Sequence, residues 1–305
     1  MSTPADTRVA PPRPPAPEPQ AAPPEIVRVH VPERSWRSEL RAIRIVWWRE
    51  LIRFVNDRLR IVTALIQPLL FLFVLGSGLQ QLSSASTHGV NLKTFIYPGI
   101  LCLAVMFTAM FSAASIVWDR EFGFLREMMV APIRRSSIVL GKCLGGATVA
   151  SFQGVILLCL AWAVDIPYSA TLILGVFALQ LLLAFSITAF GVMVAIRIKQ
   201  MQSFMGLMQM VVMPMFFISG AMFPVANLPG WLAFLNRIDP ITYAVDPMRR
   251  LVFSHLDISA AARRTLDPGV TWGGWHVPAL LEAGIVAAMG LAMLGIAIWE
   301  FSATE

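Results

Sequence analysis

The hydrophobic residues of the chain gather into six blocks, and shorter polar stretches separate these blocks. Each block has the length of roughly 20 residues that a helix needs to cross the ~30 Å hydrocarbon core of a bilayer. We therefore expect an all-α integral membrane protein with six transmembrane helices. The predicted spans cover residues 61–79, 94–117, 143–164, 170–196, 203–223 and 277–299.

The first 34 residues differ from the rest, because they contain ten prolines and no apolar run. Such a segment cannot bury enough apolar surface to offset the entropy lost on ordering. We expect residues 1–34 to form a disordered cytoplasmic tail. A signal peptide would need an uninterrupted apolar stretch, and the tail has none.

Residues 35–58 predict an amphipathic helix, in which apolar residues recur at helical spacing: Leu40, Ile43, Trp47, Leu51 and Phe54 or Val55. A basic helix that carries Trp is typical of an "elbow" lying in the membrane interface, with arginines toward lipid phosphates. The alternative is a helix packed on a soluble domain. The residues expected to serve the interfacial role are Arg41, Arg44, Trp47, Trp48 and Arg53.

Composition supports the membrane interpretation, since 57% of residues are hydrophobic, 14% are charged and the mean hydropathy is +0.68. Soluble domains carry about 25% charged residues. The net charge of +6 does not predict a nucleic-acid partner, because the basic residues stand beside the apolar blocks. With both termini in the cytoplasm, 18 Lys and Arg lie inside and 6 outside. The positive-inside rule therefore places both termini in the cytoplasm.

The predicted spans contain almost no ionisable residues, so the sequence does not favour a proton- or sodium-coupled carrier. Gly141-Lys142 is the nearest approach to a phosphate-binding loop, but Ser136 and Cys143 replace residues that the loop needs. The four histidines and three cysteines show no catalytic or metal-binding spacing. We expect no catalytic residue, no metal site and no bound cofactor in this chain.

The loop after the second span, residues 118–142, combines charges of both signs with Phe and Met. This chemistry is typical of a docking element for another protein, in which apolar side chains fill a groove and charges set the register. The alternative is a charged loop that merely stays inside. The candidate docking residues are Asp119, Arg120, Glu121, Phe122, Arg126, Glu127, Pro132, Arg134 and Arg135.

On the outer side, residues 224–255 are too apolar for a solvated loop and too rich in proline for a span. We expect a re-entrant segment with two short helices, around 231–235 and 241–252, covered by protein or lining a water-filled cavity. The alternative is an interfacial flap that seals the bundle.

In these loops the chain resembles the bacterial ABC-2 type permeases, the membrane subunits of daunorubicin-resistance, nodulation-export and polysaccharide-export systems. The resemblance covers residues 35–300. One departure is Asp239, because the family usually has Asn before this proline. The matching stretches are Tyr97-Pro98-Gly99, Asp119-Arg120-Glu121-Phe122-Gly123, Met129-Val130-Ala131-Pro132, Leu140-Gly141-Lys142 and the outer motif of Asn236, Asp239, Pro240, Tyr243 and Arg249.

The resemblance implies a type V exporter fold in the bacterial inner membrane, with a six-span permease domain over residues 59–305. It also implies a dimer of permeases, two copies or two relatives, with two separate ATP-binding cassette subunits that hold ATP and Mg. Residues 118–142 would then contain the coupling helix, and Glu121 and Arg126 are the best candidates for transmitting force from the cassettes.

The resemblance leaves the transported compound open. A hydrophobic drug, lipid or natural product is favoured, because flexible Met side chains suit a lipophilic compound. The alternatives are a polysaccharide or lipid-linked saccharide, or a regulator that has the fold and transports nothing. Met and Phe rows in spans are also common in ordinary helix packing. The candidate substrate path consists of Met106, Met110, Met208, Met213 and Phe217.

Overall fold

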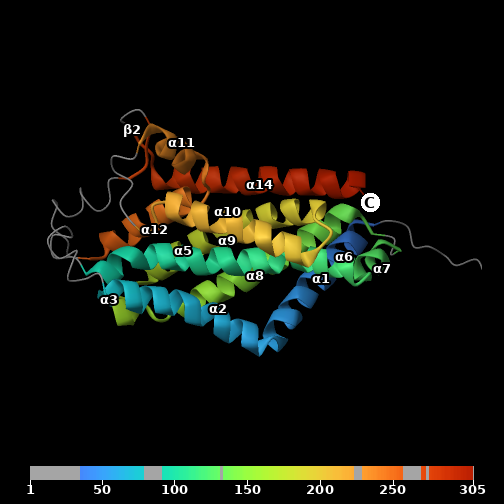
Figure 1. Cartoon of the computed structure of the whole chain (residues 1–305), viewed down its shortest axis with the longest axis horizontal. Coiled ribbons are helices and arrows are strands. Elements are labelled where there is room, and N and C mark those ends of the chain that lie inside the picture. The colour runs from blue at the N-terminus through green and yellow to red at the C-terminus, as the bar shows by residue number, and fades with distance from the viewer. Residues whose placement is uncertain are drawn as a thin grey trace, which may run out of the picture. The chain divides into compact units, whose positions relative to one another are not determined.

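The computed structural model describes residues 35–78, 91–130, 133–222, 229–256, 269–272 and 275–304, and it is almost entirely helical there. The predicted tail, residues 1–34, lies outside the described residues. Figure 1 shows the long helices running side by side. The elements are α1 (Trp36–Asn56), α2 (Arg58–Leu70), the π-helix η1 (Phe71–Leu75), α3 (Gly76–Gly78), α5 (Leu92–Ala113), α6 (Ser115–Glu121), α7 (Phe124–Val130), α8 (Arg135–Leu158), the 3-10 helix η2 (Ala161–Val164), α9 (Ala170–Arg197), α10 (Met201–Ile218), α11 (Gly230–Ile238), α12 (Thr242–Ser254), β1 (Thr271–Trp272), β2 (Trp275–His276) and α14 (Ala279–Thr304).

Six helical stretches in the described residues are long and apolar enough to cross a membrane, which confirms the predicted fold class. The predicted third span is displaced, because the helix runs over Arg135–Leu158 rather than 143–164. Its early start was missed because Lys142 and the arginines before it lower the local hydropathy. The six stretches are Arg58–Gly78, Leu92–Glu121, Arg135–Leu158, Ala170–Arg197, Met201–Ile218 and Ala279–Ala303.

The core lies around α5, which packs against both α8 and α9. In the span that begins with α5, 89% of the most apolar 18-residue stretch is buried within this one chain. Small residues allow the close approach, since a Cβ on Gly146 would lie 2.5 Å from the Thr188 side chain and one on Gly191 2.6 Å from that of Ala113. By contrast, only 17% of the corresponding stretch in α2 and 22% of that in α10 are buried. These two helices offer apolar faces to lipid or to another subunit.

Helix α1 packs along α8, and α8 has glycines at the contact. A Cβ on Gly141 would lie 2.7 Å from the Val46 side chain, and one on Gly145 equally close to Glu50. The face that α1 buries within the chain shares only Phe54 with the predicted apolar stripe, which the sequence assigned to the membrane interface. That stripe is largely exposed or half-buried, and the buried residues are Glu39, Ala42, Val46, Glu50 and Phe54.

Two ends of the helical bundle can be distinguished in Figure 1, where α6 and α7 lie at one end and α3, α11, α12 and β2 at the other. Helices α1 and α2 meet at an angle, because Asp57 between them is not helical (φ −92°, ψ 72°), and α1 runs from this corner toward α6. At the second end, β1 and β2 form a small antiparallel pair in which Trp272 faces Trp275.

Candidate functional site

A buried cluster of charges joins α1, α6 and α8 at the end of the bundle that carries α7. The Lys142 ammonium lies 3.0 Å from the Glu50 carboxylate and 2.6 Å from that of Asp119, and it donates to the Ser115 hydroxyl at 2.9 Å. Only 2% of Lys142 is exposed. A charge this deep in a span is tolerated only when it is paired, and here two carboxylates pair it.

Two arginines of α1 complete the cluster. Arg49 donates to Asp119 at 2.5 Å, and Arg53 lies 3.8 Å from the other oxygen of the same carboxylate. Arg53 also stacks over the Trp118 ring at 4.6 Å from its centroid. Asp119, predicted as a docking residue, is therefore buried and paired inside the chain. Glu50 and Lys142 were missed, although a lone lysine inside an apolar helix could have prompted a search for its carboxylate.

A second buried carboxylate, Glu39, fastens the other end of α1 to the start of α8. It accepts from the backbone N–H of Arg134 at 3.1 Å and from the Ser137 hydroxyl at 2.6 Å. A carboxylate at a helix N-terminus satisfies free N–H groups and complements the helix dipole. Glu39 and Glu50 thus hold α1 along α8 at two points, three helical turns apart.

The predicted coupling loop forms two short helices with a sharp turn at Gly123, where φ is +82°. Arg120 points into the chain and donates to the Ile198 carbonyl at 2.9 Å. Arg135 donates to the Ser302 carbonyl at 3.0 Å, whereas Arg134 is exposed. The Arg126 side chain and Pro132 lie outside the described residues.

Five other side chains of this loop are exposed, whereas Leu125 is buried in the core. Phe122 is 69% exposed, Phe124 53% and Val130 86%, and the charged side chains of Glu121 and Glu127 are exposed as well. The structure thus separates the predicted docking residues into an outward group and an inward group. We call Glu121, Phe122, Phe124, Glu127 and Val130 the α6–α7 surface.

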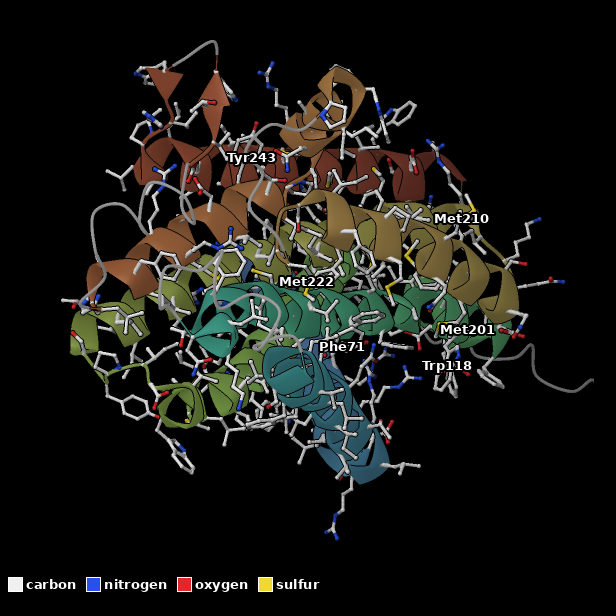
Figure 2. All side chains as sticks on the ribbon, turned by 60° about the vertical axis from the view of Figure 1, so that its left-hand side comes forward. Phe71, Trp118, Met201, Met210, Met222 and Tyr243 are labelled. Carbon is white, nitrogen blue, oxygen red and sulfur yellow. The ribbon has the colours of Figure 1, made fainter. Side chains whose placement is uncertain are left out.

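A cavity of about 530 Å³ lies beside the charged cluster, between α2, α5, α6 and α10. Figure 2 shows Trp118 and Met201, which both line this cavity, close together. Its wall is mostly apolar, with three charged residues near one end. The lining residues are Arg53, Asp57, Leu59, Arg60, Thr63, Ala64, Gln67, Pro68, Leu103, Phe107, Thr108, Phe111, Ala114, Ser115, Trp118, Met201 and Met205.

The wall that α2 contributes is interrupted at Pro68. Proline has no N–H, so the carbonyl of Ala64 loses its usual partner within the helix. Gln153 of α8 supplies the missing donor, with its Nε2 at 2.7 Å from that oxygen, and its own Oε1 accepts from the Thr108 hydroxyl. The next turn is π-helical over Phe71–Leu75. Helix α2 is therefore irregular over two successive turns.

The five residues of the predicted substrate path do not line one cavity. Met110 and Met208 line a hollow of about 30 Å³ that shares Phe107, Phe111 and Met205 with the larger cavity. Met106 is fully buried in α5, Met213 is half-buried and Phe217 is largely exposed.

The predicted outer motif forms a hydrogen-bonded junction between α10, α11 and α12. Asn236 donates to the Ile218 carbonyl at 2.7 Å, and Tyr243 donates to the Arg237 carbonyl at 2.8 Å. Arg249 donates to the Gly220 carbonyl at 2.8 Å and lies over the Phe95 ring.

Asp239 and Pro240, which complete this motif, are also buried. One oxygen of Asp239 accepts from the Ile241 N–H at 2.9 Å, while the other has no hydrogen-bond donor among the described residues. Burial raises the pKa of Asp239 to about 8, although the Ile241 N–H opposes the shift.

A further buried ion cluster, which the sequence did not predict, ties α12 to α14. Arg250 pairs with Asp246 and lies 3.2 Å from Glu282, and it donates to the Val277 carbonyl at 2.8 Å. Asp246 in turn accepts from the Val270 N–H at 3.1 Å. This cluster holds the segment before α14 against α12.

The six apolar helices that are long enough to cross a membrane define a polytopic membrane protein. The ABC-2 type transporter family model matches residues 41–253, more than half of the chain, and the chain belongs to this family. This confirms the resemblance found in the sequence.

Three relatives illustrate the range of the family. The chain is 29% identical to ycf38 of Cyanophora paradoxa, which carries the name of a transport permease, over 68% of this chain and 72% of the relative. It is 30% identical to YbhR of Escherichia coli K12, named a probable multidrug ABC transporter permease, over 53% of this chain but 44% of the relative. It is 26% identical to DrrC of Mycobacterium tuberculosis H37Rv, over 66% of this chain and 73% of the relative. DrrC is named a probable doxorubicin resistance ABC transporter permease protein.

Proposed function

We propose that the chain is the membrane-spanning subunit of an ATP-driven exporter, which moves a hydrophobic drug, lipid or natural product out of the cytoplasm or the inner leaflet. Membership of the ABC-2 type transporter family is the observation that carries this proposal. ATP and Mg would bind to separate ATP-binding cassette subunits, so this chain would transmit force rather than hydrolyse ATP.

The α6–α7 surface is the proposed seat of the cassette. Its exposed Phe122, Phe124 and Val130 offer apolar contacts, and Glu121 and Glu127 offer charges that set the register. A push on α7 reaches the membrane helices by two routes. Helix α6 continues α5, and Arg49 of α1 contacts both Asp119 and the Met128 sulfur, the latter at 3.5 Å.

The exposed apolar faces of α2 and α10 support a second permease beside this one, either a copy or a relative. The cavity opens beside the same two helices. Ser115 and Trp118 of α6 line this cavity, so movement of the α6–α7 surface would change the cavity wall. We place the protein in a bacterial inner membrane with both termini in the cytoplasm.

Two other functions stay open. A polysaccharide or lipid-linked saccharide would use the same coupling, and a regulator with this fold would bind partners but transport nothing. ATPase activity of the permease purified with its cassette in lipid, measured against drugs, lipids and lipid-linked sugars, separates the three. Stimulation by drugs or lipids supports the proposal, and stimulation by sugars alone favours the second function. Absence of any co-purifying ATPase contradicts both exporter functions.

A further inference from the structure

We propose that the cavity beside α2 binds a lipid-like amphiphile with an anionic headgroup, and that this compound is the transported substrate. The headgroup would lie at Arg60, and the apolar tail would follow the walls of α5 and α10. This inference rests on the proposed function, since it names the class of compound that the exporter moves.

The apolar part of the cavity suits such a tail. Leu103, Phe107 and Phe111 of α5, Met205 of α10 and Pro68 of α2 all contribute apolar lining. Cavities that bind lipid- and drug-sized molecules occupy about 300–1,000 Å³, and this one occupies about 530 Å³. Because α2 is so little buried in this chain, a lipid-soluble compound could reach the cavity from the side.

The charged end of the cavity favours an anion. The Nη2 atom of Arg60 is buried, yet it has no hydrogen-bond acceptor among the residues that the structure describes. A buried guanidinium N–H group without an acceptor is costly, and a carboxylate or phosphate supplies the missing acceptor with a charge-assisted hydrogen bond. The Phe111 ring lies beside this group, with its centroid 6.0 Å from the Arg60 guanidinium carbon.

The other charges of the lining are already occupied. Arg53 is held between Trp118 and Asp119, as described above. Asp57 accepts from the backbone N–H of Arg60 at 3.0 Å and so caps the start of α2. Arg53 is thus paired with Asp119, a carboxylate outside the lining, and Arg60 is the lining cation with a buried donor left to fill. An amphiphile with a cationic headgroup would meet repulsion at this end.

Direct binding to the permease without its ATPase tests the site. The purified chain in phosphatidylcholine nanodiscs is titrated with three fluorescent amphiphiles that share one alkyl tail and carry a phosphate, a phosphocholine or an ammonium headgroup. We expect the phosphate amphiphile to bind at least about tenfold more tightly than the ammonium one. Equal affinities would overturn the proposal.

Variants localise the effect. Arg60→Gln is expected to weaken binding of the phosphate amphiphile about tenfold and not to weaken binding of the ammonium amphiphile, which offers Arg60 no acceptor. Arg58→Gln is the matched control, because Arg58 is exposed and does not line the cavity. An equal loss in Arg58→Gln would show that general surface charge attracts the probe, which contradicts the assigned site. Met205→Trp, which fills the tail region while keeping Arg60, should weaken all three amphiphiles, and unchanged binding there would also contradict it.

The complex with its cassette separates a substrate from a resident lipid. The phosphate amphiphile should stimulate the ATPase of the wild-type complex and of the Arg58→Gln complex at least about twofold, and Arg60→Gln should remove that stimulation. Binding without stimulation would overturn the assignment as substrate. If no ATPase associates at all, the proposed function fails, whereas the nanodisc measurement still reports whether the cavity prefers an anion.

Discussion

At the scale of single residues, buried charge is the feature that hydropathy did not reveal. Lys142, Glu50 and Asp119 come from three helices, and the buried Lys142 is acceptable in its place because the two carboxylates pair it. The same holds for Arg250 with Asp246 and Glu282. Such residues make α1, α6 and α8 dependent on one another.

Replacing Lys142 tests this dependence. Lys142→Met removes the central cation and leaves two buried carboxylates facing each other, with only the flanking arginines as partners. Removing one partner of a buried ion pair lowers the free energy of unfolding by about 3–5 kcal/mol. We expect a clear drop in the apparent Tm of the detergent-solubilised protein. Lys199→Met is the control, because Lys199 is exposed, and a similar Tm for both variants would contradict the structural role of Lys142.

Asp239 predicts a dependence of stability on pH. Its pKa in the folded protein, about 8, lies above the ordinary value of 3.8. Between these two pH values the folded protein therefore retains a proton that the unfolded chain has lost. The contribution of Asp239 to the free energy of unfolding is therefore largest below about pH 4. As the pH rises from there to about 8, this contribution falls by at most about 1.4 kcal/mol per pH unit.

Asp239→Asn removes the titrating group and retains an oxygen for the Ile241 N–H. We expect this variant to unfold at a higher temperature than the wild type at pH 8, with a much smaller difference at pH 5. Thermal unfolding across that range measures both values. A constant difference between the two proteins at every pH would show that the carboxyl does not take up a proton on folding.

At the scale of elements, α2 is the helix most open to change. It has few contacts within the chain, Pro68 breaks its hydrogen-bond ladder, and a π-helical turn follows. Gln153 of α8 compensates for the break. A side chain on a neighbouring helix thus holds the wall of the cavity in place.

Gln153→Leu should loosen that wall. Losing one hydrogen bond to a buried carbonyl lowers the free energy of local opening by about 1–1.5 kcal/mol. Amide hydrogen exchange in peptides covering residues 58–75 should therefore become about tenfold faster. Gln209→Leu, on the exposed face of α10, is the control. Adding Pro68→Ala to Gln153→Leu restores a backbone donor for Ala64 and should reverse the effect. Failure of that rescue would show that the Ala64 carbonyl is not the cause.

The α6–α7 surface is the second element with a testable role. Phe124→Asp places a charge on an exposed apolar contact, and Glu121→Arg reverses a charge beside it. Each should remove most of the co-purified ATPase while the amount of permease in the membrane stays unchanged. Trp162→Ala is the control, because Trp162 is as exposed as Phe122 but follows the opposite end of α8. Undiminished ATPase in the first two variants would exclude this surface as the docking site.

At the scale of the whole molecule, orientation determines which end meets the ATPase. With Cys159 replaced by Ser, since it is the exposed native cysteine, an added cysteine reports its own side. Ser254→Cys, on α12, should react with an impermeant thiol reagent added to intact cells. Glu127→Cys, on α7, should react only after permeabilisation. The reverse pattern would overturn the topology and, with it, the cytoplasmic location of the α6–α7 surface.

Much of this molecule was determined by its sequence alone. The six spans, the short helices between them and the family follow from hydropathy, from proline and glycine positions and from local motifs, because these depend on neighbours along the chain. Errors at this level were displaced ends, as in the third span, where charged residues belong to the helix and lower its apparent hydropathy.

Only the tertiary structure decided which side chains meet. The buried face of α1 carries Glu39 and Glu50, and no local pattern reveals that Lys142 and Ser137 lie opposite them. The cavity and the unfilled donor of Arg60 likewise need four helices in place. The physical reason is that pairing and cavity shape depend on distances between segments far apart in the chain, whereas spans depend on the free energy of transferring each segment into the membrane.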